Sequence, residues 1–177
     1  MAKKRKFAAY RALERPFTRF SKKKKFNFIR ARPVVRIVRF DSGDLQKVFS
    51  NAIYLTSKEG LQIRDLAIES ARLSANRLLE KSLGKNGFRL KITKYPHHVL
   101  RENPLASGAG ADRMSTGMAQ SFGKSIGRAV QIKPGDTLFK LEIEKQHLPV
   151  ARRALQRAAQ KLPCSWRIKE EIPAVKA

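Results

Sequence analysis

Strand-like runs of apolar residues begin in this chain after Pro33. Valine, isoleucine and phenylalanine dominate residues 34–40, which is typical of a strand, and the sequence Asp-Ser-Gly at 41–43 is typical of a turn. We therefore predict a strand over 34–40 that ends in a turn at 41–43. A second short apolar run predicts another strand over 52–55.

A helical period replaces this pattern in the next segment. Thr56 followed by Glu59 has the spacing of a capping box, in which both side chains bond to backbone amides at a helix start. Apolar residues then recur at helical spacing until Gly84, which favours a helix end. The apolar stripe consists of Ile63, Ala67, Ala71, Ala75, Leu78 and Leu79. Because alanine is small, we expect this face to pack closely against a sheet.

The segment after the helix alternates with a period of two. Residues 84–87 predict a turn, and the strand predicted over 88–92 has one buried face and one cationic face that carries Arg89 and Lys91. The remaining predicted elements are a short helix over 114–122, strands over 128–132 and 138–143 with a turn at 134–136 between them, a second long helix with Pro149 in its first turn, and a last strand over 164–168.

The order of these elements predicts an α+β fold in which two helices pack on a mainly antiparallel β-sheet. Two segments do not fit this pattern, namely a basic N-terminal extension and a long glycine-rich loop. We therefore divide the chain into a basic, aromatic-rich arm at 1–33 and an α+β domain at 34–177. The arm and the loop are the parts that we expect to carry the function.

Charge gives the first indication of a partner. The chain has 39 Lys and Arg against 14 Asp and Glu in 177 residues, a net charge of +25. A compact domain tolerates this self-repulsion more readily when a polyanion neutralises it, so the partner is expected to be a nucleic acid. Residues 1–32 hold 13 of the cations and a single acid, Glu14, which makes the arm the most basic part.

Aromatic residues are interleaved with the cations of the arm without a regular period. They are Phe7, Tyr10, Phe17, Phe20, Phe26 and Phe28. This combination suits stacking on RNA bases, and the lysines at 22–25 add point charges for phosphates. A solvated basic tail or a nuclear-localisation patch is the alternative, although such a tail has no use for aromatic residues. The residues predicted to bind RNA are Lys3, Lys4, Arg5, Lys6, Tyr10, Arg11, Arg19, Lys22, Lys23, Lys24, Lys25, Arg30, Arg32, Arg89, Lys91, Lys124 and Arg128.

The glycine-rich loop has an unusual composition. Residues 107–111 have almost no side chains to pack, so their backbone can approach another backbone closely. Arg101 and Arg113 bracket this run and place fixed cations at the base of a finger, which suits a crevice lined by phosphates. An ordinary mobile loop explains the composition equally well. The loop residues of interest are Arg101, Asn103, Ser107, Gly108, Ala109, Gly110, Ala111, Asp112 and Arg113.

Motifs for catalysis, cofactors and metals are incomplete. Gly-Lys-Ser at 123–125 ends like a P-loop, but Met118 occupies the position of its first glycine. Gly-Ala-Gly at 108–110 begins like a dinucleotide fingerprint, whose third glycine position is Arg113. Asp112 has no matched acid or nucleophile nearby, and a salt bridge to Arg113 that shapes the loop explains it better. We predict no catalytic residue and no cofactor.

Metal and membrane sites are not expected either. His97 and His98 are adjacent and on a strand would point to opposite faces, so each is better explained as a satisfied or RNA-facing histidine than as a ligand. The single Cys164 excludes an intrachain disulfide framework and a zinc site built from several cysteines. No apolar run reaches the about 18 residues of a membrane span, and the N-terminus lacks the apolar segment of a signal peptide. We expect a cytoplasmic protein with no membrane partner and no homo-oligomer.

Residues 95–114, followed by Gly-Met at 117–118 and Phe-Gly-Lys at 122–124, closely resemble the universal large-subunit ribosomal protein sixteen family in its archaeal and eukaryotic L-ten-e type. The motif Glu-Ser-Ala-Arg at 69–72 also resembles family sequence, as does the helix around 154–163. The resemblance is strong over residues 68–168 and weak in the arm. The chain departs from the family at Ser125, where proline is usual, and at the lysines 22–25.

The resemblance implies a non-enzymatic, structural component of the large ribosomal subunit that binds rRNA near the peptidyl transferase centre. Family members lie near tRNA in the A site, and the loop at 101–113 would be aimed at the acceptor end of tRNA in the P site. Neighbouring ribosomal proteins and late assembly factors are the other implied partners. A basic architectural DNA- or RNA-binding protein and an RNA-modifying enzyme outside the ribosome are the alternatives.

Overall fold

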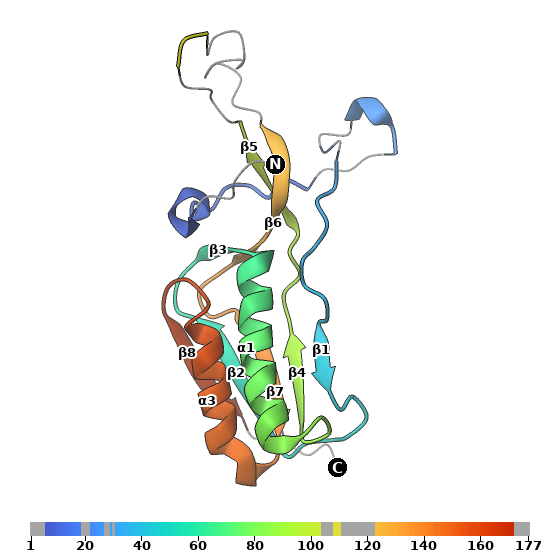
Figure 1. Ribbon diagram of the computed structural model, residues 1–177, viewed down its shortest axis with the longest axis vertical. Helices are drawn as coiled ribbons and strands as arrows, with labels where there is room; N and C mark the ends of the chain where they lie inside the picture. Colours follow the sequence, from blue (N-terminus) through green and yellow to red (C-terminus); the bar gives the residue numbers. More distant parts are fainter. Residues whose placement is uncertain are drawn as a thin grey trace.

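The computed structural model describes residues 6–18, 22–26, 29, 31–103, 108–110 and 123–171. These residues form two antiparallel sheets and two α-helices (Figure 1). The larger sheet has the order β1 (Asp41–Gly43), β4 (Phe88–Ile92), β7 (Thr137–Ile143), β2 (Asn51–Ser57) and β8 (Trp166–Glu171). The smaller sheet has the order β3 (Leu61–Arg64), β6 (Lys124–Ile132) and β5 (His98–Glu102).

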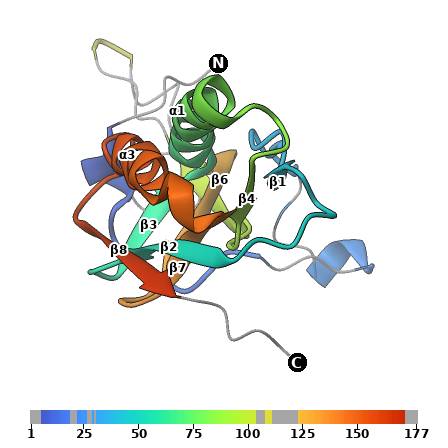
Figure 2. The same ribbon diagram turned by 90° about the horizontal axis from the view of Figure 1, so that it is seen from below.

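The helices α1 (Asp65–Leu83) and α3 (Leu148–Ala159) pack side by side on one face of the five-stranded sheet (Figure 1 and Figure 2). We call these two helices and the five-stranded sheet the body. Its hydrophobic core includes Phe88, Phe139, Ile53, Leu55, Ile68, Leu79 and Leu155. Short 3-10 helices are η1 (Phe7–Tyr10), η2 (Lys24–Phe26) and η3 (Lys145–His147). The expected α+β fold, with two helices on antiparallel sheet, is confirmed.

The two sheets are joined where two chain connections run next to each other. The connection from β2 to β3 and the turn from β6 to β7 both pass from one sheet to the other. The Ser57 amide donates to the Asp136 carbonyl at 2.9 Å, and the Gly135 amide donates to the Ser57 carbonyl at 2.8 Å. These bonds tie the two connections together, so the smaller sheet leaves the body in a fixed direction.

The Glu-Ser-Ala-Arg motif on α1 contains a buried ion pair. Arg72 donates from Nε and Nη2 to the two carboxylate oxygens of Glu69, at 2.9 and 2.7 Å, and its Nη1 lies 3.4 Å from the Ser42 hydroxyl on β1. Glu69 raises the pKa of the Arg72 guanidinium, more than burial lowers it. A bidentate pair satisfies both buried charges, and here it also holds β1 against the helix.

Most of the later elements agree with the sequence pattern. The strands predicted over 52–55, 88–92, 128–132 and 138–143 are present as β2, β4, β6 and β7, with β2 and β6 longer than predicted. Gly84 ends α1 with a φ of +72° and donates its amide to Glu80, and Pro149 lies in the first turn of α3. The last strand, predicted over 164–168, runs from Trp166 to Glu171. The helix predicted over 114–122 lies outside the described residues.

The predicted strand over 34–40 is wrong. Among the residues that the structure describes, this segment forms no strand, although its last residue, Phe40, accepts the Ile92 amide of β4 at 2.8 Å. The turn predicted at 41–43 is instead strand β1, paired with β4. The Arg36 amide donates to the Asp65 carboxylate at 3.1 Å, so a side chain on α1 takes the place of a neighbouring strand. Only part of the apolar run is used in the core, because Ile37 is buried while Val34 and Val38 are 85% and 75% exposed.

The predicted capping box is also wrong. Thr56 belongs to β2 and donates its hydroxyl to the Arg167 carbonyl, while the Ser57 hydroxyl bonds to Glu59 in the turn that follows. Residues Leu61–Arg64 pair with β6, and the helix begins at Asp65, whose carboxylate accepts the Leu66 amide. Pairing with a distant strand therefore outweighs the local helix signal.

Gly43 gives a test of how tightly β1 is packed. Its φ is +93°, and a Cβ atom added there would lie 2.0 Å from the Phe88 carbonyl oxygen. Gly135 has a similar φ of +85° but open space around it. We expect Gly43→Ala to lower the free energy of unfolding by about 2–4 kcal/mol and Gly135→Ala by about 1 kcal/mol, because only the first adds a clash to the backbone strain. Urea denaturation measures both, and equal losses would show that β1 moves aside freely.

Candidate nucleic-acid interface

Strands β5 and β6 form a ribbon that projects beyond the body (Figure 1). Near its end Arg101 pairs with Ser125 and Glu102 with Lys124, with a register shift after Leu100. Beyond Asn103 the described part of the loop is Gly108 to Gly110, which is exposed. The ribbon therefore carries the base of the predicted finger and sets where the finger leaves the protein.

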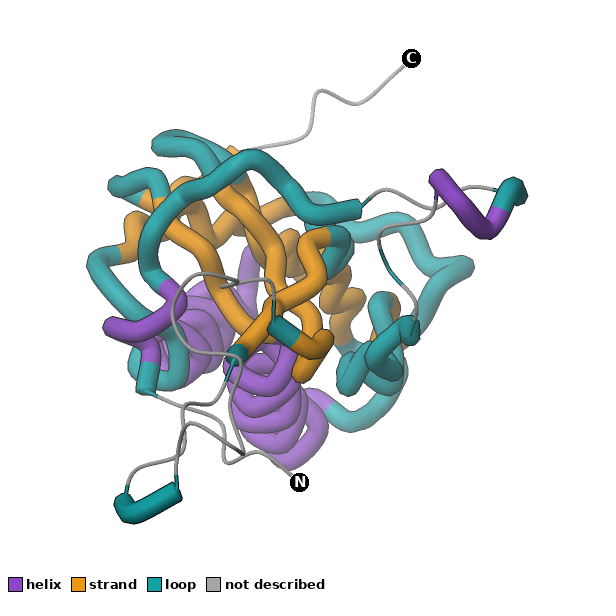
Figure 3. Tube along the Cα trace, turned by 90° about the horizontal axis from the view of Figure 1, so that it is seen from above, coloured by secondary structure: helices purple, strands orange, loops and turns teal. Residues whose placement is uncertain are grey.

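The arm crosses the base of this ribbon, with η1 on one side and η2 on the other (Figure 1 and Figure 3). The Phe17 amide donates to His98 Nδ1 at 2.8 Å, and the Phe17 carbonyl accepts the Val99 amide at 3.2 Å. Phe17 thus occupies the outer edge of β5. Sheet edges present unpaired backbone groups, and here the arm satisfies some of them.

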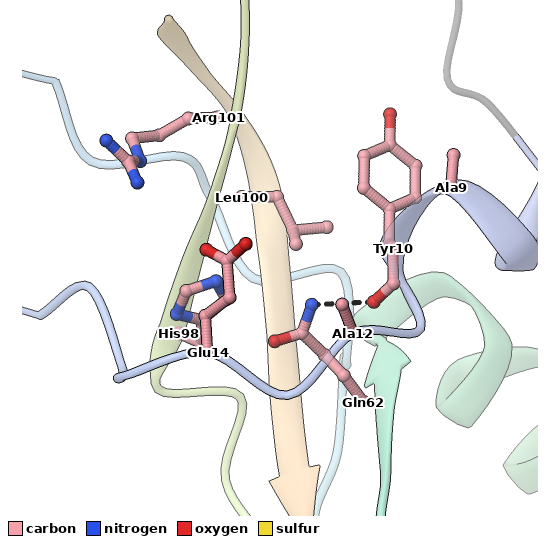
Figure 4. Close-up of a pocket in the computed structure, with 8 residues that line it drawn as sticks. All are labelled: Ala9, Tyr10, Ala12, Glu14, Gln62, His98, Leu100 and Arg101. Atoms are coloured by element: carbon pink, nitrogen blue, oxygen red, sulfur yellow. Dashed lines mark hydrogen bonds between the residues drawn. The ribbon is translucent and has the colours of Figure 1, made fainter. Parts of the chain in front are cut away.

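Two glutamines on the smaller sheet hold the arm through its carbonyl groups. Gln62 and Gln131 lie opposite each other on β3 and β6. Gln62 Nε2 donates to the Tyr10 carbonyl and Gln131 Nε2 to the Glu14 carbonyl, each at 2.8 Å, and the two side chains bond to each other at 3.0 Å. Figure 4 shows Gln62 reaching Tyr10 from the strand. A hydrogen-bonded pair of this kind fixes the arm at two points.

Cation–π contacts add to this attachment. The Arg101 guanidinium lies 4.3 Å from the centre of the Phe17 ring, and the Arg64 guanidinium lies 5.7 Å from that of Tyr10. The Tyr10 hydroxyl lies 3.5 Å from the Glu102 carboxylate. An arginine on an aromatic face keeps its charge and its donors. These contacts attach the arm through the aromatic rings of Phe17 and Tyr10.

A polar cavity of about 330 Å³ remains between the arm and the smaller sheet. Figure 4 shows Tyr10, Glu14, Gln62, His98 and Arg101 around it. Burial lowers the pKa of His98, and the positive charges of His97 and Arg101 lower it further against the opposing effect of Glu14. His98 is thus a neutral acceptor for the Phe17 amide, which confirms the expectation of a satisfied histidine.

The structure brings some of the predicted RNA-binding residues to the ribbon and leaves others elsewhere. Lys124 is exposed on β6, while Arg128 donates to the Tyr95 hydroxyl at 2.9 Å. Arg89 and Lys91 lie on β4 of the larger sheet, where Arg89 is 3.6 Å from the Glu142 carboxylate. Arg89 therefore already has a counter-ion within the body, while Lys91 is exposed.

Most described cations of the arm are at the surface. The exposed residues among those predicted are Lys6, Arg11, Lys22, Lys23, Lys25, Arg32, Lys91 and Lys124. Tyr10, Arg101 and Asn103 are half-buried. The predicted residues outside the described part of the chain are Lys3, Lys4, Arg5, Arg19, Arg30, Ser107, Ala111, Asp112 and Arg113, and the side chain of Lys24 is also outside it.

Sequence reasoning missed the residues that attach the arm. Gln62 and Arg64 alternate with Leu61 and Ile63, a strand pattern that the helix prediction obscured. Ser125 was noted only as a departure from proline, yet its hydroxyl donates to the Ala31 carbonyl at 3.0 Å and adds another contact with the arm. No local signal marks a carbonyl of the arm as the partner of such side chains.

Among the residues that the structure describes, no group of three His, Cys, Asp or Glu side chains is arranged to hold a metal ion. The helices described here are also too short or too polar to cross a membrane.

Comparison with known proteins decides the family. Residues 16–169 match the family described as ribosomal protein L16p/L10e. The chain belongs to this family. It is 40% identical to large ribosomal subunit protein uL16 of Archaeoglobus fulgidus over 90% of this chain and 88% of that protein. It is 43% identical to the protein of that name from Nanoarchaeum equitans, over 100% of this chain and 97% of the relative, and 42% identical to that of Caldivirga maquilingensis, over 90% of each.

Family membership confirms the resemblance noted in the sequence and identifies the chain as a ribosomal protein rather than an enzyme. The match covers the ribbon, nearly all of the body and the arm from Pro16 onward, whereas Tyr10 and Glu14 lie before it. The ribbon and its contact with Phe17 are therefore features of a ribosomal protein, and their use in RNA binding is a question of function.

The bond from Phe17 to His98 predicts a pH dependence of stability. In the unfolded chain His98 binds a proton near its ordinary pKa of 6.5, whereas in the folded protein its pKa is lower. The contribution of neutral His98 to the free energy of unfolding is therefore fully present above pH 6.5, and it is lost as the pH falls towards the folded pKa. Between pH 7.5 and 5.5 we expect His98 to contribute a loss of up to about 1.4 kcal/mol in the free energy of unfolding.

Denaturation of two variants at both pH values measures this contribution. His98→Gln offers the Phe17 amide an oxygen acceptor that does not titrate, so it should remove most of the loss. His97→Gln removes only a secondary cause of the lowered pKa of His98 and leaves both its burial and the bond from Phe17 in place, so it should keep most of the loss. Equal pH dependence in the wild type and His98→Gln would contradict the assignment.

Proposed function

We propose that this chain is a non-enzymatic, structural constituent of the large ribosomal subunit in the cytoplasm, anchored on rRNA by its arm and its ribbon. The observation that carries the proposal is the match to a ribosomal protein family over residues 16–169, with relatives named as large-subunit proteins. The net charge of +25 supports a polyanionic partner.

The arrangement of the arm favours electrostatic placement on folded RNA. Exposed lysines and arginines lie along the arm, and backbone contacts to Gln62, Gln131 and His98 hold its first part on the smaller sheet. Cations that are positioned before binding lose less freedom when they meet phosphates. Each phosphate contact should also steepen the salt dependence of binding, by a slope of roughly 0.9 per contact as for B-form DNA, or roughly 0.7 as for single strands.

The proposal of further partners, beyond rRNA, rests on the family resemblance. We propose that the finger at 101–113 faces tRNA in the A and P sites near the peptidyl transferase centre, and that neighbouring ribosomal proteins and late assembly factors contact the same protein. The ribbon supports this idea because it carries the base of the finger away from the body (Figure 1). The half-buried Arg101 lies at that base.

Sedimentation of a cell lysate through a sucrose gradient tests the main proposal. We expect this protein in the large-subunit and translating-ribosome fractions at near-stoichiometric amounts, and any release in a salt wash should rise steeply with the salt concentration because phosphate contacts hold the protein. A position at the top of the gradient would favour an RNA-modifying enzyme outside the ribosome. Recovery on chromosomal DNA would favour an architectural protein.

Deletion of residues 103–111 tests the role of the finger. Because the arm and the body keep the docking charge, the deletion should leave incorporation into the subunit largely intact while slowing tRNA use or late subunit maturation. Replacement of the four lysines at 22–25 by alanine is the contrasting variant and should weaken incorporation first. Quantitative mass spectrometry of subunits and polysome profiles measure both effects. Loss of incorporation on deletion of the finger would show that the finger is structural.

A further inference from the structure

A second hollow lies between α3 and β8, far along the chain from the predicted RNA-binding residues. Its volume is about 580 Å³, and it is open to solvent, since four of the eight residues that line it are exposed. Leu55 and Ile168 lie opposite each other on β2 and β8 and line it together with Ala159 of α3. This apolar lining is at the edge of the five-stranded sheet, where β8 is the last strand.

Trp166 forms one wall of this hollow. It is the only tryptophan of the chain, and it is half-buried. Its indole N–H donates to the Pro163 carbonyl at 2.8 Å, which satisfies the polar edge of the ring and fixes the plane of the ring. A fixed indole beside an open hollow is a suitable platform for stacking another planar ring.

Polar side chains without partners surround the apolar lining. Gln156 and Gln160 of α3, Lys58 after β2 and Arg167 of β8 line the hollow, and all four are exposed. Their side chains make no hydrogen bond or ion pair with the residues that the structure describes. By contrast, Arg152 and Glu170, which also lie on α3 and β8, pair with each other. The hollow therefore offers two amides and two cations to a ligand.

We propose that this hollow binds one unpaired nucleotide of an RNA, with its base against Trp166 and its phosphate near Lys58 and Arg167. A planar base fits the indole and the apolar lining, and glutamine amides can donate to and accept from base edges. A phosphate suits the two cations better than a neutral apolar side chain of a protein would. The proposal rests on the proposed function, since rRNA would supply the nucleotide.

Fluorescence of the single tryptophan tests the proposal in the full-length protein. The probe is the single-stranded RNA hexaadenylate at physiological salt, and the matched control is a hexamer of the same ribose-phosphate backbone without bases. Base stacking should quench Trp166 in a saturable way, while the abasic hexamer should leave its emission nearly unchanged. The anisotropy of end-labelled RNA measures total binding in the same samples.

Variants at exposed positions show whether the surrounding side chains take part. Gln156→Leu and Lys58→Ala should each weaken the binding seen by Trp166 roughly three- to tenfold, as expected for the loss of one hydrogen bond or ion contact. Gln146→Leu and Lys145→Ala, both on η3 before the start of α3, make the same chemical changes away from the hollow and should not alter the binding seen by Trp166. All four side chains are exposed, so none of the variants removes core packing.

The outcomes separate this inference from the proposed function. RNA binding without quenching of Trp166, or equal quenching by the abasic hexamer, would overturn the nucleotide site while the affinity for RNA stands. Equal weakening by the control variants would overturn it as well, because the effect would then be one of general charge or stability. Absence of any RNA binding would overturn the site together with the rRNA contacts of the proposed function.

Discussion

The hydrogen bonds between Ser57 and the turn at Gly135 and Asp136 are the constraint on which the rest of the structure depends. At this point two connections leave the five-stranded sheet together and become β3 and β6 of the smaller sheet. A single connection could rotate, whereas two that are hydrogen-bonded to each other cannot do so without breaking the backbone bonds that join them. The direction of the ribbon is therefore set by the body.

The arm further stabilises the smaller sheet that starts at this junction. The ribbon alone is a narrow sheet with an open edge at β5, and Phe17 occupies part of that edge while Gln62 and Gln131 hold the preceding turn of the arm. Small sheets gain independent stability from such coverage. The arm is thus a structural part of the smaller sheet as well as a source of positive charge. The amino-acid composition of the arm indicates only its charge.

The sequence predicted elements well where burial follows a simple period. β4 alternates buried and half-buried or exposed residues, and the apolar face of α3 includes Ala151, Ala154 and Ala158. The prediction failed where a residue far away in the sequence determines the secondary structure. The run at 34–40 has the composition of a strand, but its Arg36 amide bonds to Asp65, and the helix signal after Thr56 yields to the pairing of β3 with β6.

The candidate interface was predictable only in part for the same reason. Clustered cations and a glycine-rich loop are local features, so they could be singled out from the sequence. The bonds that attach the arm join residues about 50 to 120 positions apart, and the hollow beside Trp166 joins the end of α3 to an edge strand. Such sites depend on which distant segments the fold brings together, so no local sequence pattern predicts them.

Charge distribution links these observations. In the body, acids lie next to cations: Glu142 faces both Arg89 and Lys140, and Glu144 binds Lys47. Residues 1–32 have one acid for 13 cations, so internal pairing cannot neutralise the arm. Glutamine amides, a neutral histidine and the aromatic rings of the arm hold it on the smaller sheet. Because these contacts use backbone groups and aromatic rings of the arm, the exposed lysines and arginines of the arm stay at the surface, where a polyanion can reach them without displacing the contacts that position the arm.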